Sequence, residues 1–167
     1  AASAVEAAQR ALFPFFNALT TLLQAQRQAN SEYDTQVRLT GGLRSQPDWS
    51  NIEILCEPLC GALGKLADAL DKLYHLCDED DDLDEDDALY ELLSTRQRVT
   101  ETKEQLRAII SEPKPNGIYW ATISHRDGEV LLNSAPLHVG ELLKKSIFDT
   151  KDCVVLTSAT LRAQSGF

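Results

Sequence analysis

The residues with the clearest potential for chemistry are a cluster of small side chains near the C-terminus, Thr157-Ser158-Ala159-Thr160. They follow an apolar run, Cys153-Val154-Val155-Leu156, which predicts a strand buried on both faces. In open α/β sheets, ligand sites gather beyond the carboxyl ends of the strands, and small side chains there allow close approach to a phosphate-binding neighbour. An ordinary strand-to-loop junction has the same composition, so the residues alone indicate only that 157–160 could line a site.

A second candidate is a stripe of basic side chains, Arg96, Lys103 and Arg107, beside the apolar seam of an expected helix. Contact with a DNA backbone is one interpretation of this stripe. The other is that long basic side chains extend into solvent from the edge of a packed helix face. Both interpretations remain open at this point.

The four cysteines do not predict a metal site. Cys56 and Cys60 are four residues apart on an expected helix and could face one ion, but no nearby residues complete a ligand set. Cys56 and Cys77 occupy seam positions, which favours core packing. The cysteines are few, irregularly spaced and set in apolar runs, so we expect reduced thiols and a cytoplasmic setting.

The net charge of −10 arises from one stretch. Residues 78–87 hold nine of the 26 acidic side chains, which leaves 17 acids against 16 bases elsewhere. This run lacks the glycine and the spaced ligands of a calcium loop, which favours a solvated loop. For His75 and His138, with no visible triad or metal partners, we expect surface or capping roles.

The length and composition fit one domain, or one domain and part of another. The chain has 167 residues, of which 43% are hydrophobic. It has no apolar run of about 18 residues, so we expect no membrane span. Because it begins with Ala and contains no Met, we expect it to be a segment of a longer protein.

The elements that would position these residues begin with a helix over residues 1–29. Two interleaved seven-residue series of apolar side chains predict it. Their members are Val5, Leu12 and Leu19, and Ala8, Phe15 and Leu22. Pro14 lies inside the pattern and should kink or split the helix. A polar connector follows, broken by Gly41-Gly42 and Pro47.

The strongest periodicity predicts a second helix, with Asp48 as its N-cap and a bend at Pro58. A third helix is predicted from about Asp84 to Ser111, and Pro113 ends it. The seams are Ile52, Cys56, Leu59, Leu63, Leu66, Leu70, Leu73 and Cys77 in the second helix, and Leu92, Val99, Leu106 and Ile110 in the third. Each of the three helices carries one apolar stripe that a neighbour must cover. We therefore expect an elongated three-helix antiparallel bundle.

The periodicity changes after Pro115. Strands are predicted at 118–123 and 129–132, joined by a turn at 125–128. A short helix at 138–147 and the strand at 153–156 complete part of an α/β sheet. The predicted fold class is mainly α with a small α/β tail.

The hydroxyl cluster also carries a family resemblance. Ser158-Ala159-Thr160 resembles motif III of superfamily 2 helicases, and the stretch 156–161 is similar to the form of that motif in DinG-like enzymes. The stretch 131–139, with Leu142-Leu143 and Ile147-Phe148, resembles the family's approach to that strand. The resemblance covers residues 117–167, whereas the helices match in layout only. It implies a DNA helicase of the DinG/XPD type, with a helical arch-like insertion at 1–112 and a partial RecA-like motor domain at 113–167.

The resemblance implies how the functions would be divided. Single-stranded DNA would pass beneath the arch, and ATP and Mg²⁺ would bind in the parent protein. Ser158, Ala159 and Thr160 would form the coupling motif between nucleotide state and DNA grip. The chain has no phosphate loop and no acidic nucleotide box, so the isolated segment should be inactive. The competing expectation is a non-enzymatic helical adaptor that binds a protein partner.

Overall fold

The computed structural model describes residues 2–26, 33–78, 86–155 and 157. The chain divides into two compact units, residues 1–135 and 136–167. The division falls after most of the β-hairpin, because the hairpin packs onto the helices and shares their core. The division into an arch-like insertion at 1–112 and a motor domain at 113–167 stays a prediction.

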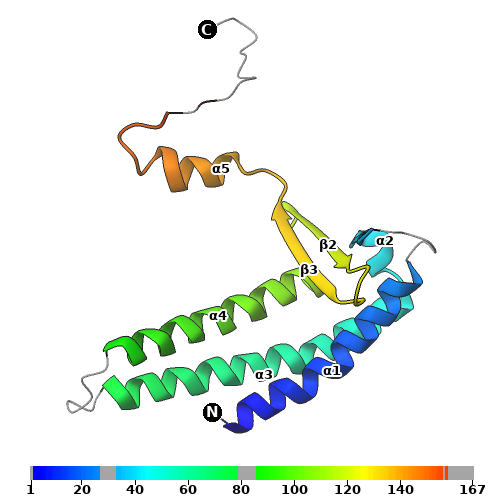
Figure 1. Cartoon of the computed structure of the whole chain (residues 1–167), viewed down its shortest axis with the longest axis horizontal. Helices are drawn as coiled ribbons and strands as arrows, with labels where there is room; N and C mark the ends of the chain where they lie inside the picture. The colour runs from blue at the N-terminus through cyan, green and yellow to red at the C-terminus, as the bar shows by residue number, and fades with distance from the viewer. Residues whose placement is uncertain (1, 27–32, 79–85, 156, 158–167) are drawn as a thin grey trace, which may run out of the picture. The chain divides into compact units, whose positions relative to one another are not determined.

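Three long helices dominate the first unit (Figure 1): α1 (Ala2–Ala25), α3 (Pro47–Asp78) and α4 (Asp86–Ile110). α3 packs against both of the others and runs antiparallel to each. The prediction of a mainly α chain is confirmed. Pro14 and Pro58 lie inside α1 and α3 without ending them, so α1 is not split.

The start of α3 differs from the prediction. Pro47, expected as a breaker, is the first residue of the helix, a position where its missing N–H has no intrahelical acceptor to lose. Asp48 therefore lies in the first turn and is not the N-cap, although its charge still suits the positive end of the helix dipole. A short helix, α2 (Gly41–Arg44), precedes α3. Thr40 caps α2, because its Oγ1 accepts a hydrogen bond from the Leu43 N–H at 3.3 Å.

A three-stranded sheet packs at one end of the helices in the order β1-β2-β3. β2 (Gly117–Ile123) and β3 (Val130–Pro136) form the predicted hairpin, with Gly128 at a φ of 74° in its turn. β1 (Thr35–Arg38) was not predicted, because it lies in the expected polar connector. It pairs antiparallel with β2, so that Thr35 lies opposite Ile123.

The second unit contains α5 (Gly140–Leu143) followed by one turn of π-helix, η1 (Lys144–Phe148), close to the helix predicted at 138–147. The strand predicted at 153–156 is wrong for the residues described there. Residues 153–155 form no strand, and Val155 is 80% exposed. An apolar run becomes a buried strand only when a neighbouring strand takes up its backbone hydrogen bonds, and the described residues supply none at this position.

The core lies where the sheet meets the helices. Its largest fully buried side chains include Trp49, Phe15, Leu19 and Ile110. The predicted seam of α3 is buried only in the half near the sheet. Ile52 and Leu59 lie in the core, Leu66 and Leu70 are half-buried, and Leu73 is 36% exposed. The apolar stripe thus continues beyond the elements that cover it.

Candidate functional site

The hydroxyl cluster is the first predicted site. Ser158, Ala159 and Thr160 lie outside the described residues, and Thr157 is exposed. The proposed coupling role of this motif therefore stays a prediction from the sequence.

The basic stripe lies along the contact between α3 and α4. The Arg96 Nε is 2.8 Å from the Asp71 carboxylate, and the Arg107 Nη2 is 2.7 Å from the Glu112 carboxylate. The hydrogen bond that Arg107 donates to the Glu112 carboxylate raises the pKa of Arg107. Exposed pairs of this kind contribute little to stability, but they partly neutralise the positive surface.

Lys103 of the same stripe lies along α3. Its Cδ would be 3.9 Å from a Cβ placed on Gly64, an ordinary van der Waals distance, so the lysine stem passes close to α3 at this point. All three cations thus sit at the edge of a packed helix pair, and two of them have carboxylate partners. This geometry matches the interpretation of basic side chains at a helix edge, and a DNA contact remains a prediction.

Cys56 and Cys60 form a buried thiol pair, with their Sγ atoms 3.7 Å apart. The hydrogen bond between them and burial raise the pKa of Cys56, whereas the same hydrogen bond lowers the pKa of Cys60. The described residues hold no group of three or more His, Cys, Asp or Glu side chains arranged for a metal ion. The pair fits the expected packing role.

The other titratable candidates are dispersed. Residues 79–85 of the acidic run lie outside the described part of the chain. His75 lies 3.8 Å from Asp71 on the preceding turn, and its ring meets Tyr74 edge-on. His138 is exposed in the second unit. These positions assemble no catalytic group.

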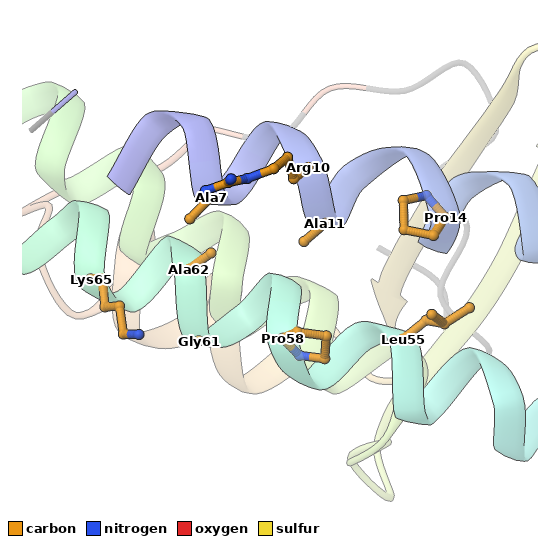
Figure 2. Close-up of a pocket in the computed structure, with 9 residues that line it drawn as sticks. All are labelled: Ala7, Arg10, Ala11, Pro14, Leu55, Pro58, Gly61, Ala62 and Lys65. Carbon is orange, nitrogen blue, oxygen red and sulfur yellow. The ribbon is translucent and has the colours of Figure 1, made fainter. Parts of the chain in front are cut away.

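A shallow groove runs between α1 and α3 (Figure 2). It is lined mainly by small or cyclic residues that let the two helices approach closely. The lining residues are Ala7, Arg10, Ala11, Pro14, Leu55, Pro58, Gly61, Ala62 and Lys65. Only Arg10 and Lys65 are polar, and neither is buried. The groove therefore has the character of a packing seam.

The sheet offers a surface that the sequence analysis did not identify. Along β2, Tyr119, Ala121 and Ile123 are buried against the helices, while Ile118, Trp120 and Thr122 alternate with them and are half-buried. The period-two pattern of residues 118–123 was the available signal. It predicted a strand, but the pairing with β1 was needed to reveal which residues share its second face.

No part of the described chain forms a helix long and apolar enough to span a membrane. No family model matches the sequence, and neither the curated proteins nor the solved structures include a match.

Proposed function

We propose that this chain is part of an ATP-dependent DNA helicase of the DinG/XPD type, a cytoplasmic enzyme that moves along single-stranded DNA and unwinds duplexes in DNA repair or replication. The observation that carries the proposal is the stretch Leu156–Leu161, in which small hydroxyl residues follow an apolar run. Its similarity to motif III extends back through residues 131–148.

The second unit supports this proposal through its exposed apolar side chains. All of its large apolar residues between 137 and 148 are exposed: Leu137, Val139, Leu142, Leu143, Ile147 and Phe148. Burying one such side chain is worth about 1.5–3 kcal/mol, so a surface of this density is normally covered. A surrounding motor domain would supply that cover, and would also supply strands to pair with residues 153–156.

The proposal assigns different roles to this chain and to the rest of the enzyme. Ser158 and Thr160 would donate or accept hydrogen bonds that link the nucleotide site to the DNA-binding surface. The described residues include no phosphate loop and no group suited to hold Mg²⁺. Contacts with ATP and Mg²⁺ are therefore assigned to other parts of the parent protein, and the helices would enclose DNA held by the motor domains.

The test is to sequence the reading frame on both sides of residues 1–167 and to assay its product. We expect a Gly-x-x-x-x-Gly-Lys-Ser/Thr loop upstream and DNA-stimulated ATP hydrolysis by the full protein. The isolated chain should release no phosphate above background. A frame without a phosphate loop, or a full product without ATPase activity, would contradict the proposal.

One observation favours the alternative of a non-enzymatic adaptor. The half of the α3–α4 pair remote from the sheet exposes Leu73, Leu76, Tyr90 and Leu93. Exposed apolar side chains on a helix pair are typical of a protein-binding surface. A partner retained by the full product, and lost when Leu76 and Tyr90 are changed to Ser, would favour the adaptor if ATPase activity is absent.

A further inference from the structure

The second face of the sheet carries a defined set of side chains. Arg38 of β1 lies directly opposite Trp120 of β2, and Gln36 lies opposite Thr122. Directly opposed residues of antiparallel strands share a face, with Cβ atoms about 4.5–5.5 Å apart. Asn133 of β3 joins this face, because its Nδ2 donates a hydrogen bond to the Thr122 Oγ1 at 3.2 Å.

The charge of this sheet differs from that of the chain as a whole. The chain carries 26 acidic and 16 basic residues, yet the three strands contain no carboxylate and one charged side chain, Arg38. The arginine is exposed and Trp120 is half-buried beside it. The face thus presents an aromatic ring, a guanidinium and three hydrogen-bonding side chains, Gln36, Thr122 and Asn133, beside the apolar side chains Ile118 and Leu131.

We propose that the face formed by Arg38, Trp120, Thr122 and Asn133 is a stacking platform for single-stranded nucleic acid. A base would lie on the Trp120 ring, and Arg38 would contact the adjacent phosphate. The hydroxyl and amide groups would reach the edges of the base. Aromatic side chains borne on a sheet bind single strands in this way in other folds.

A protein partner fits this face less well. The centre of a protein interface is depleted of charge and is apolar, whereas here the tryptophan lies directly opposite Arg38, and Gln36 and Asn133 accompany the apolar Ile118 and Leu131. A duplex is also a poor occupant, because its bases are stacked on one another and are not free to stack on an indole ring. The absence of carboxylates on the strands removes the local repulsion that an anionic polymer meets elsewhere on this chain.

A hollow at the hairpin end of the same strands carries a further aromatic side chain and a further arginine, together with one aspartate. It is lined by Tyr33, Asp34, Ser124, His125 and Arg126. Thr35 pairs with Ile123, so this hollow lies directly beyond the paired part of β1 and β2. The phenol of Tyr33 and the guanidinium of Arg126 are exposed there. A single strand crossing Trp120 could continue toward them along β2.

The affinity of one platform should be low. Stacking on one aromatic side chain changes affinity by between about 5-fold and about 150-fold per base. With a single ring and one cation at its centre, and a net charge of −10 on the chain, binding should be measurable at low salt and weak at physiological salt.

Tryptophan fluorescence offers a direct assay, because the chain contains two tryptophans and Trp49 is fully buried. A single-stranded oligothymidine should quench the Trp120 signal at low salt. The same oligonucleotide should leave a Trp120→Phe variant, in which only Trp49 emits, unquenched. Anisotropy with a labelled oligothymidine gives affinity independently of the tryptophan signal.

The variants separate stacking from charge. Trp120→Ala should weaken binding at least 5-fold, and Trp120→Phe should weaken it less because a ring remains. Arg38→Gln should lower the slope of log K against log salt by about 0.7, the change expected for one phosphate contact on a single strand. Phe13→Ala and Arg98→Gln remove an exposed aromatic and an exposed arginine elsewhere, and should change nothing. Thermal unfolding of each variant shows whether it is folded.

Several results would overturn the platform. These are the absence of Trp120-dependent quenching at millimolar oligonucleotide, equal competition by inorganic polyphosphate, and loss of binding only when Arg96, Lys103 and Arg107 are changed together to Ala. Tighter binding of a duplex than of oligothymidine would also contradict it. The inference depends on the proposed function in one respect: a helicase would bring single-stranded DNA to this face. A phosphate loop in the reading frame without Trp120-dependent binding would refute the platform and leave the helicase proposal intact.

Discussion

Arg44 is the residue at which the sequence-distant parts of the first unit are joined. Its Nη1 donates a hydrogen bond to the Ile110 carbonyl at 2.7 Å, and its Nε donates to the Leu39 carbonyl at 3.4 Å. The guanidinium lies 5.0 Å from the ring centre of Trp49 and 5.6 Å from that of Tyr119. One side chain therefore connects the end of α4, the end of β1, the start of α3 and β2.

The Ile110 carbonyl explains why this contact should matter. Ile110 is the last residue of α4, and the carbonyls of a final helical turn have no intrahelical donor. Ile110 is fully buried, and its carbonyl accepts hydrogen bonds from both Arg44 and the Trp49 Nε1–H, the latter at 3.2 Å. A cation at this end of a helix is also favourable for the dipole.

We predict that Arg44→Met destabilises the chain by about 2.5 kcal/mol. The lost charged hydrogen bond contributes about 1.5–3 kcal/mol, and the lost contact with the aromatic rings about 0.5–2 kcal/mol. An offset of about 1 kcal/mol arises because the Nη2 of Arg44 is buried without a hydrogen-bond partner among the described residues. The net loss corresponds to a fall of about 5–10 °C in Tm.

Urea denaturation followed by far-UV circular dichroism measures this loss, with Arg98→Met as the matched change at an exposed arginine of α4. Arg44→Lys keeps the charge but not the planar group, so it should fall between wild type and Arg44→Met. Trp49→Phe keeps a ring beneath Arg44 and removes one of the two donors to Ile110. Because the double variant with Arg44→Met leaves that carbonyl without either donor, it should cost about 1 kcal/mol more than the sum of the single changes.

A change of less than about 0.5 kcal/mol for Arg44→Met would refute this reasoning, since surface substitutions have effects of that size. If the double variant loses only the sum of the two single losses of stability, the idea that Arg44 and Trp49 satisfy the same Ile110 carbonyl is refuted.

Three further predictions concern single sites. In the native chain a maleimide should label exposed Cys153 first and half-buried Cys77 more slowly, and labelling of Cys56 or Cys60 at the rate of Cys153 would mean that the thiol pair is not buried. Gly117→Ala should destabilise the chain by about 1–3 kcal/mol, because the new Cβ would lie 2.7 Å from Cε2 of the Tyr119 ring. Gly61→Ala should stabilise the chain by about 0.5–1 kcal/mol, because a Cβ at this position of α3 meets open space. Equal denaturation midpoints for the two variants would contradict this contrast. In the full protein, Ser158→Ala with Thr160→Ala should impair unwinding more than nucleotide binding, and equal loss of both in a folded variant would indicate a structural role.

The sequence predicted the elements whose signal is local. Three helices were found from their seven-residue repeats, and the hairpin from period-two alternation around Gly128. The limits of this reasoning appear at β1 and at residues 153–155. The polar residues 35–38 form a strand because β2 offers backbone partners, while an apolar run without a partner does not. Strand formation depends on pairing, which neither stretch encodes alone.

Contacts between residues far apart in the sequence also limit what could be predicted about the site residues. Arg96, Lys103 and Arg107 all lie on α4, but the ion-pair partners Asp71 on α3 and Glu112 beyond α4 could not be inferred from spacing. Trp120 and Arg38 were not identified, because 81 intervening residues separate two side chains that the sheet register places opposite one another.

The heptad seam of α3 leads to a final prediction about local stability. The sequence repeats its apolar positions evenly over four heptads, but the buried residues of α3 end at Ala62, and those of α4 begin at Leu106. Local opening requires less free energy where few apolar side chains are buried. Amides of residues 66–77 should therefore exchange hydrogen faster than those of residues 52–62, although both lie within one continuous helix.

Hydrogen exchange measured by mass spectrometry or NMR, at two protein concentrations, tests this gradient. Equal protection of all amides along α3 at both concentrations would refute the link between the burial of apolar side chains and the free energy of local opening. Protection of residues 66–77 that appears only at the higher concentration would show that a second copy covers Leu73 and Leu76. That result would also favour the adaptor, because it would demonstrate that the exposed half of the α3–α4 pair can bind protein.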